Sequence, residues 1–135
     1  MAFRVANKFP IDTKPRVAVG VSIPFSNAAV YNSTYTTQEQ LKSNLINFFM
    51  TEPGERYMNP TYGGGLKRIL FEQLVTGTFD FVKELVQNKV AEYFPNVQVM
   101  DLQVYGNEDQ NILKVELTYQ VVNFGITDTI NLTLQ

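Results

Sequence analysis

The sequence contains no cysteine, no histidine and no tryptophan. Without cysteine or histidine, the usual zinc sites, serine- and cysteine-type catalytic triads, redox pairs and disulfide frameworks are excluded. Histidine is also the commonest general base near neutral pH, so enzyme chemistry on this chain would have to rely on carboxylates, lysine or tyrosine. We therefore predict no cofactor, no metal site and no catalytic residue.

Long apolar runs and an excess of positive charge are absent as well. No stretch approaches the ~20 apolar residues that span a bilayer, and the basic N-terminus is not followed by the apolar run of a signal peptide. The 11 Lys and Arg residues against 13 Asp and Glu give a net charge of −2, which argues against a duplex-binding protein. We expect neither a membrane nor a nucleic acid as partner.

The 135 residues, 44% of them apolar, suffice for one domain with its own core. We predict a single α+β domain over residues 37–135, preceded by an extended N-terminal arm and loop over residues 1–36. In the arm, Pro10 and Pro15 fix the backbone and no helical period is present. Residues 17–23 alternate, which indicates a strand or an extended docking segment, and residues 26–36 are expected to be a loop.

The first helix is predicted to begin at Thr36 or Thr37, because each is followed three residues later by Glu or Gln, the spacing of a capping box. Pro53 and Gly54 end it. Its apolar stripe consists of Leu41, Leu45, Phe48 and Phe49.

Two more helices are expected before residue 97. A short one buries Leu66, Ile69, Leu70 and Leu74, and Gly77 is expected to break it. Thr78 is predicted to cap a longer helix that carries Asp80 in its first turn and ends near Phe94.

The last forty residues change to a period of two, with strands predicted over residues 97–105, 112–122 and 126–134. In the first of these, Met100, Leu102 and Val104 are expected to share a face. The fold class is α+β: helices pack on one face of a C-terminal three-stranded antiparallel meander, with an extended N-terminal arm.

The last strand has no residue that protects an edge. Residues 129–134 contain no Lys, Pro or bulge signal, the usual devices against unwanted strand pairing. They are therefore suited to accept a strand from a partner. On pattern alone, residues 17–23 of the same chain are an equal candidate for covering this edge.

Two further motifs lie between residues 52 and 65. Glu52 and Glu55 offer a pair of carboxylates of the kind used in glycoside hydrolysis, although any acidic loop offers such a pair. The run Gly63-Gly64-Gly65 precedes a helix as in a phosphate loop but lacks the Gly-Lys-Ser/Thr ending. A tight turn that lets a helix pack closely is the favoured interpretation of the glycines.

The segment from residue 51 to 72 resembles a specific family. The matching residues are Thr51, Gly54, Glu55, Arg56, Pro60, Tyr62, Gly63, Leu70, Phe71 and Glu72. Their order is similar to that in the baseplate wedge and sheath-initiator proteins of contractile phage tails, which are related to a baseplate subunit of type VI secretion systems. The resemblance extends over roughly residues 37–134.

This resemblance implies a structural protein, not an enzyme. Members of the family bind other wedge subunits and initiate the tail sheath by sharing β-strands with its first ring. The implied partners are other baseplate wedge proteins and the tail sheath protein, with the tail tube or hub as further candidates. The implied location is the tail baseplate of the virion, reached from the host cytoplasm during assembly.

The resemblance also implies a set of partner-binding residues. They are Gly54, Glu55, Arg56, Pro60, Gly63, Phe94, Pro95, Thr129, Ile130, Asn131, Leu132, Thr133 and Leu134. For Arg56, bracing of its own loop is as plausible as partner contact. The family's aromatic-Glu-Pro-Arg motif is Tyr93-Phe94-Pro95-Asn96 here, so both of its charges are lost and Phe94 must contribute apolar contact instead.

Two alternatives from other functional classes remain. One is a tail-associated peptidoglycan glycosidase that uses Glu52 and Glu55. The other is a nucleic-acid-binding tail factor that uses the basic residues of the N-terminal arm, which are Arg4, Lys8, Lys14 and Arg16.

Overall fold

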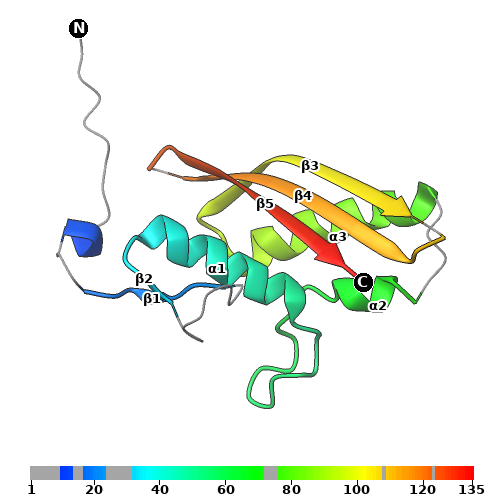
Figure 1. Ribbon diagram of the computed structural model, residues 1–135, viewed down its shortest axis with the longest axis horizontal. Coiled ribbons are helices and arrows are strands. Elements are labelled where there is room, and N and C mark those ends of the chain that lie inside the picture. Colours follow the sequence, from blue (N-terminus) through cyan, green and yellow to red (C-terminus); the bar gives the residue numbers. More distant parts are fainter. Residues whose placement is uncertain (1–9, 14–16, 24–31, 72–75, 108, 123) are drawn as a thin grey trace, which may run out of the picture.

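A computed structural model of the chain describes residues 10–13, 17–23, 32–71, 76–107, 109–122 and 124–135. Its main sheet is antiparallel and consists of β3 (Val97–Asn107), β4 (Ile112–Val121) and β5 (Ile126–Leu134), with β4 in the middle. Three helices accompany it, α1 (Thr37–Met50), α2 (Leu66–Ile69) and α3 (Thr76–Tyr93). Figure 1 shows that the strands run as a meander, with β5 on the α1 side.

The sheet buries one face, as the period of two requires. On β4, every second side chain from Leu113 to Val121 is buried, and those between them are exposed or half-buried. The buried face packs against α1 and α3, and the core contains Leu45, Phe48, Phe49, Val82, Val86 and Val90 from these helices. The predicted α+β class, with helices on one face of a three-stranded meander, is confirmed.

One predicted face is wrong at Met100. The register of β3 against β4 shifts between Val99 and Asp101, so a β-bulge interrupts the alternation. Val99 is half-buried before it, Leu102 is buried after it, and Met100 between them is 56% exposed. Met100 therefore does not share the inner face with Leu102.

The start of α1 follows the capping prediction and adds a contact that the sequence did not indicate. The Thr36 hydroxyl accepts a hydrogen bond from the Glu39 N–H at 3.3 Å, and the Glu39 carboxylate accepts from the Tyr35 N–H. Asp12, in the 3₁₀-helix η1 (Pro10–Thr13), accepts from both the N–H and the hydroxyl of Thr37, at 2.8 and 2.7 Å. This acidic group at the helix N-terminus ties η1 to α1.

Where the structure describes residues 1–36, they are less uniform than an extended arm and loop. Besides η1, a short ribbon pairs β1 (Gly20–Val21) with β2 (Ser33–Thr34). The second of these strands falls in the predicted loop. Residues 17–23 therefore pair with residues just before α1 and not with β5.

The third helix starts earlier than predicted. It begins at Thr76, so Gly77, predicted to end the short helix, instead lies in the first turn of α3, and Asp80 lies beyond that turn. Glycine keeps its N–H and costs a helix only backbone entropy, about 1 kcal/mol relative to alanine, so the helix can include it. Leu74, predicted to be buried by the short helix, lies outside the described residues. No helix in the described ranges is long and apolar enough to cross a membrane.

The hydroxyl of Tyr119 is an exception to the pairing of buried polar groups. Tyr119 is fully buried on β4, and its hydroxyl has no hydrogen-bond partner among the described residues. Burial, and to a lesser extent the carboxylate of Asp128 opposite it in the sheet, raise the pKa of Tyr119 above its usual value of 10.0.

We expect Tyr119→Phe to raise the free energy of unfolding by up to about 1 kcal/mol at neutral pH, because it removes an unpaired buried hydroxyl and keeps the ring. The raised pKa means that the folded state holds the phenolic proton more tightly, so the native chain loses stability as the pH rises above 10.0. This loss should be smaller in the variant. Urea denaturation of both proteins at neutral and alkaline pH measures the two effects, and a variant that is less stable at neutral pH would contradict the assignment.

Candidate partner-binding surfaces

The loop between α1 and α2 projects from the body of the molecule (Figure 1). Backbone hydrogen bonds fold it back on itself: the Gly54 N–H donates to the Pro60 carbonyl at 2.8 Å, and the Asn59 N–H donates to the Arg56 carbonyl at 3.3 Å. At its tip, Tyr57 and Met58 are 96% and 90% exposed. The loop is therefore an internally bonded projection that carries two large apolar side chains into solvent.

Arg56 braces this loop from inside. Its guanidinium carbon lies 4.0 Å from the centre of the Tyr62 ring, a cation–π geometry. Tyr62 in turn packs edge-on against Phe48 of α1, with ring centres 4.9 Å apart, and the Tyr93 hydroxyl donates to the Thr61 carbonyl at 2.9 Å. The structure thus gives Arg56 a bracing role, and because the residue is exposed, its hydrogen-bond donors also remain accessible to a partner.

The glycines at the end of the loop are required by close packing. A Cβ on Gly63, whose φ is +134°, would lie 2.5 Å from the Thr51 carbonyl oxygen. A Cβ on Gly64 would lie 2.8 Å from Phe49 Cδ1 and 2.9 Å from Phe49 Cα. Gly54, with φ +97°, has open space around it, so its own requirement is conformational. The favoured prediction of a tight turn agrees with this geometry.

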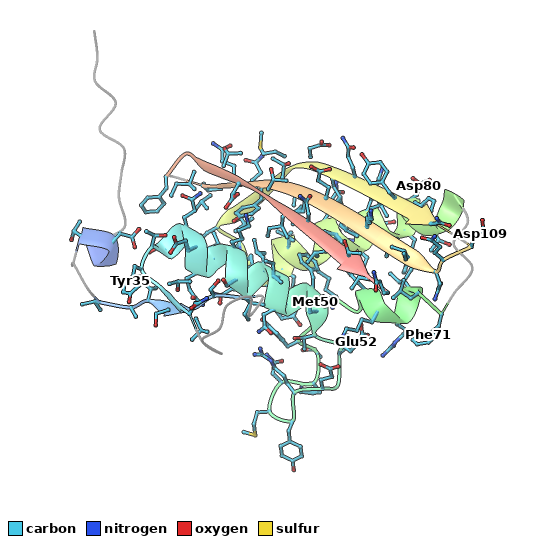
Figure 2. All side chains as sticks on the ribbon, viewed as in Figure 1. Tyr35, Met50, Glu52, Phe71, Asp80 and Asp109 are labelled. Carbon is cyan, nitrogen blue, oxygen red and sulfur yellow. The ribbon has the colours of Figure 1, made fainter. Side chains whose placement is uncertain are left out.

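Glu52 and Glu55 are close in sequence but lie in different surroundings. Figure 2 labels Glu52 near the base of the loop, and its carboxylate accepts a hydrogen bond from the Lys67 N–H in the first turn of α2, at 2.8 Å. Glu55 is exposed. Glu52 therefore anchors α2 to the loop. The described residues contain no group of three or more acidic side chains that could hold a metal ion.

Phe94 and Pro95 follow the end of α3, where Phe94 joins an aromatic cluster with Phe48, Tyr62 and Tyr93. Phe94 is half-buried and packs edge-on against Phe48, with ring centres 5.4 Å apart. Phe94 and Pro95 line a cavity of about 380 Å³. Its other lining residues are Thr37, Leu41, Tyr93, Asn96, Val97, Val121, Val122 and Phe124. The Tyr93-Phe94-Pro95-Asn96 segment, which lacks the charges of the family motif, thus borders a largely apolar pocket.

The outer edge of β5 has no strand beside it in the described part of the chain, because β5 pairs only with β4. Ile130, Leu132 and Leu134 are buried in this chain's own core. Asn131 and Thr133 are exposed. The side chains of Ile130, Leu132 and Leu134 are therefore not available to a partner.

At the start of the β5 edge, a side chain engages the backbone. The Thr129 N–H donates to the carboxylate of Asp128 at 2.8 Å, and the same carboxylate pairs with Lys42 of α1 at 3.4 Å. The Thr129 hydroxyl lies 3.2 Å from that of Thr118 on β4. No sequence pattern marks Asp128, because its partner Lys42 is 86 residues away.

The predicted residues form two regions. The loop brings Gly54, Glu55, Arg56, Pro60 and Gly63 together, and Tyr93 hydrogen-bonds to the same loop beside Phe94 and Pro95. The residues of β5 form a separate edge. The exposed tip residues Tyr57 and Met58 lie within the motif segment but are not among the predicted partner-binding residues, because the sequence does not show that an apolar side chain is exposed.

A sequence model of the family described as baseplate wedge protein gp25 matches residues 36–125. A curated relative, baseplate wedge protein gp25 of Enterobacteria phage T4, is 28% identical over 83 residues. That match covers 62% of this chain and 63% of the phage protein, so the chain aligns with slightly less than two thirds of its relative.

Two solved structures share the fold. A candidate tail lysozyme from Geobacter sulfurreducens has a TM-score of 0.65 at 18% identity, over 74% of this chain and 93% of that one. A chain of the anti-feeding prophage baseplate, solved by cryo-electron microscopy, has a TM-score of 0.53 at 20% identity, over 84% of this chain and 81% of that one. At these identities the likeness shows a shared fold alone.

We expect Gly64→Ala to lower the free energy of unfolding by about 2 kcal/mol, because the added methyl group overpacks against the backbone of Phe49. Gly77→Ala is the matched control: Gly77 is helical with open space around it, so alanine should be neutral or stabilising by up to about 1 kcal/mol. Thermal and urea denaturation of both variants measure the difference. Equal stability of the two variants would mean that the loop does not need its close approach to α1.

Proposed function

The chain belongs to the baseplate wedge protein gp25 family, and on that premise we propose that it is a structural component of a contractile tail baseplate that initiates sheath assembly. In this proposal it binds other wedge subunits through the loop and the Phe94–Pro95 pocket. It starts the sheath by pairing the edge of β5 with a strand of the first sheath ring. The observation that carries the proposal is the open outer edge of β5.

The direction of the backbone supports strand addition at this edge. The Thr129 N–H donates to the Asp128 carboxylate, so at this residue the backbone points away from β4. Because N–H and C=O groups alternate in direction along a strand, those of Asn131 and Thr133 point the same way. Since the Thr129 N–H is occupied by Asp128, a partner strand would receive its hydrogen bonds from Asn131 and Thr133.

The side chains of β5 make this pairing depend on the backbone. Those on one face are buried in this chain's core and are unavailable to a partner. Those of Asn131 and Thr133 lie on the polar outer face of the sheet. Main-chain hydrogen bonds would provide the affinity of such a contact, and the Asp128 carboxylate, which already occupies the first donor, would fix where the partner strand begins.

Wedge contacts are proposed at the loop and at the pocket beside Phe94. Gly54, Pro60 and Gly63 shape the loop, and Arg56 and Glu55 present exposed charges on it. Pro95 is exposed at the rim of the apolar pocket that Phe94 lines. An apolar side chain of a wedge subunit would fill this pocket where the family motif would have formed a salt bridge.

The proposed location is the tail baseplate of the virion, after assembly in the host cytoplasm. The proposed partners are other wedge proteins and the sheath protein, with the tail tube or hub as additional neighbours. The net charge of −2 and the membership in a structural family both favour proteins as partners.

A strand-blocking substitution tests the β5 edge. Asn131→Pro removes the proposed donor, while Asn131→Ala removes only the side chain and keeps the N–H, so it is the matched control. We expect baseplates that carry the proline variant to lose sheath initiation and those with alanine to retain it, as counted by negative-stain electron microscopy with purified sheath protein.

Circular dichroism and a thermal melt show whether the Asn131→Pro variant is folded. A folded proline variant that starts sheath as well as the native chain would contradict the proposal. Deletion of the residues after Asp128 is not a suitable test, because it would remove three core side chains of β5.

The glycosidase alternative has little support from the geometry. Its general acid must be kept protonated at neutral pH, usually by burial, but Glu55 is exposed and Glu52 is used to anchor α2. The shared fold with a candidate tail lysozyme carries no catalytic residue onto this chain. We propose that the chain is not an enzyme.

We expect the purified chain to leave the turbidity of a peptidoglycan suspension unchanged. Glu52→Gln should lower the free energy of unfolding by about 1 kcal/mol, because it weakens a charge-assisted hydrogen bond, whereas Glu55→Gln should have no effect. Clearing of the suspension that disappears in both variants would establish the enzyme and refute the structural role.

A further inference from the structure

A second groove lies between the base of the loop, α2 and α3. It has a volume of about 300 Å³ and is lined by Pro53, Gly64, Gly65, Arg68, Ile69, Phe81, Leu85 and Lys89. Phe81 is 53% exposed. The groove thus combines apolar side chains from α2 and α3 with one cation from each helix.

The two cations have no acidic partner in the described residues, where the one ion pair joins Lys42 and Asp128. Lys89 has its ammonium nitrogen 5.5 Å from the centre of the Tyr93 ring, so it lies beside an aromatic ring. Glu52, adjacent to Pro53, is committed to the Lys67 N–H. In a chain with a net charge of −2, two unpaired cations beside an exposed aromatic ring form a local region of opposite sign.

We propose that this groove binds an acidic segment of a partner protein, which inserts one apolar side chain between Arg68 and Lys89. Charge complementarity selects the acidic flanks, since rim charges steer encounter and disfavour partners of like charge. The half-exposed Phe81 and the neighbouring Leu85 provide the apolar contact. No residue of the groove belongs to β5, so this site is independent of strand sharing.

The groove suits a peptide better than a nucleic acid. A phosphate backbone is normally neutralised by a row of Lys and Arg residues, whereas here two cations flank an apolar floor. A base could nevertheless stack on Phe81, since aromatic rings bind single strands in this way. A single-stranded oligonucleotide is therefore included in the test.

Fluorescence anisotropy of labelled peptides with the full-length chain tests the site. The probe repeats Glu-Leu-Glu, and two matched probes replace Leu by Ser or Glu by Lys. We expect saturable binding of the first probe only. Arg68→Glu and Lys89→Glu should each weaken it about fivefold or more, as for charge pairs at interfaces.

Lys114→Glu is the matched control, because it makes the same change of charge at an exposed position on the outer face of β4 and should leave binding unchanged. Amide chemical shifts provide a second measurement, with perturbations expected at Ile69 and Leu85. The proposal is overturned if the acidic probe does not bind, if Lys114→Glu weakens it as much as Lys89→Glu, or if an oligothymidine probe binds more tightly at the same residues.

Discussion

The burial of one face of the β3–β5 sheet under α1 and α3 determines which parts of this chain are left for partners. In this sheet β4 is central, and β3 and β5 are the edge strands. The side chains of Ile130, Leu132 and Leu134 on β5 are buried in the core of this chain. What β5 can still offer is its outward-facing backbone. The same packing places the strand beside α1, and Lys42 and Asp128 form an ion pair at the start of the edge. A surface of this kind is recognised by register and direction more than by side-chain chemistry.

The aromatic cluster around Phe48 connects the core to the second region. Phe48 contacts Tyr62 of the loop and Phe94 beyond α3, and the Arg56 guanidinium lies over the Tyr62 ring. Close approach of Gly63 and Gly64 to the end of α1 makes this arrangement possible. The loop is therefore held by the core and presents its exposed tip from a fixed base, which reduces the entropy that a partner would have to remove. Thus one buried ring organises both proposed wedge contacts.

Local patterns predicted most of the fold. The strands of the meander were found within two residues because alternation is a property of each strand alone, and the Thr36 cap is encoded in four consecutive residues. The bulge at Met100, the pairing of β1 with β2 and the docking of Asp12 on Thr37 were missed because each depends on contacts between distant segments. In the candidate site, the sequence motif identified the residues of the loop. It did not predict the stacking of Arg56 on Tyr62 or the hydrogen bond from α2 to Glu52, because both contacts depend on how the loop folds.

The most direct test of the account is a cryo-electron microscopy reconstruction of the assembled baseplate with its first sheath ring. The account predicts a strand of a sheath subunit that accepts hydrogen bonds from the N–H groups of Asn131 and Thr133 and begins beyond the Asp128 carboxylate. A reconstruction in which residues of the same chain cover this edge, or in which no neighbouring backbone lies within hydrogen-bonding distance of it, would contradict the account.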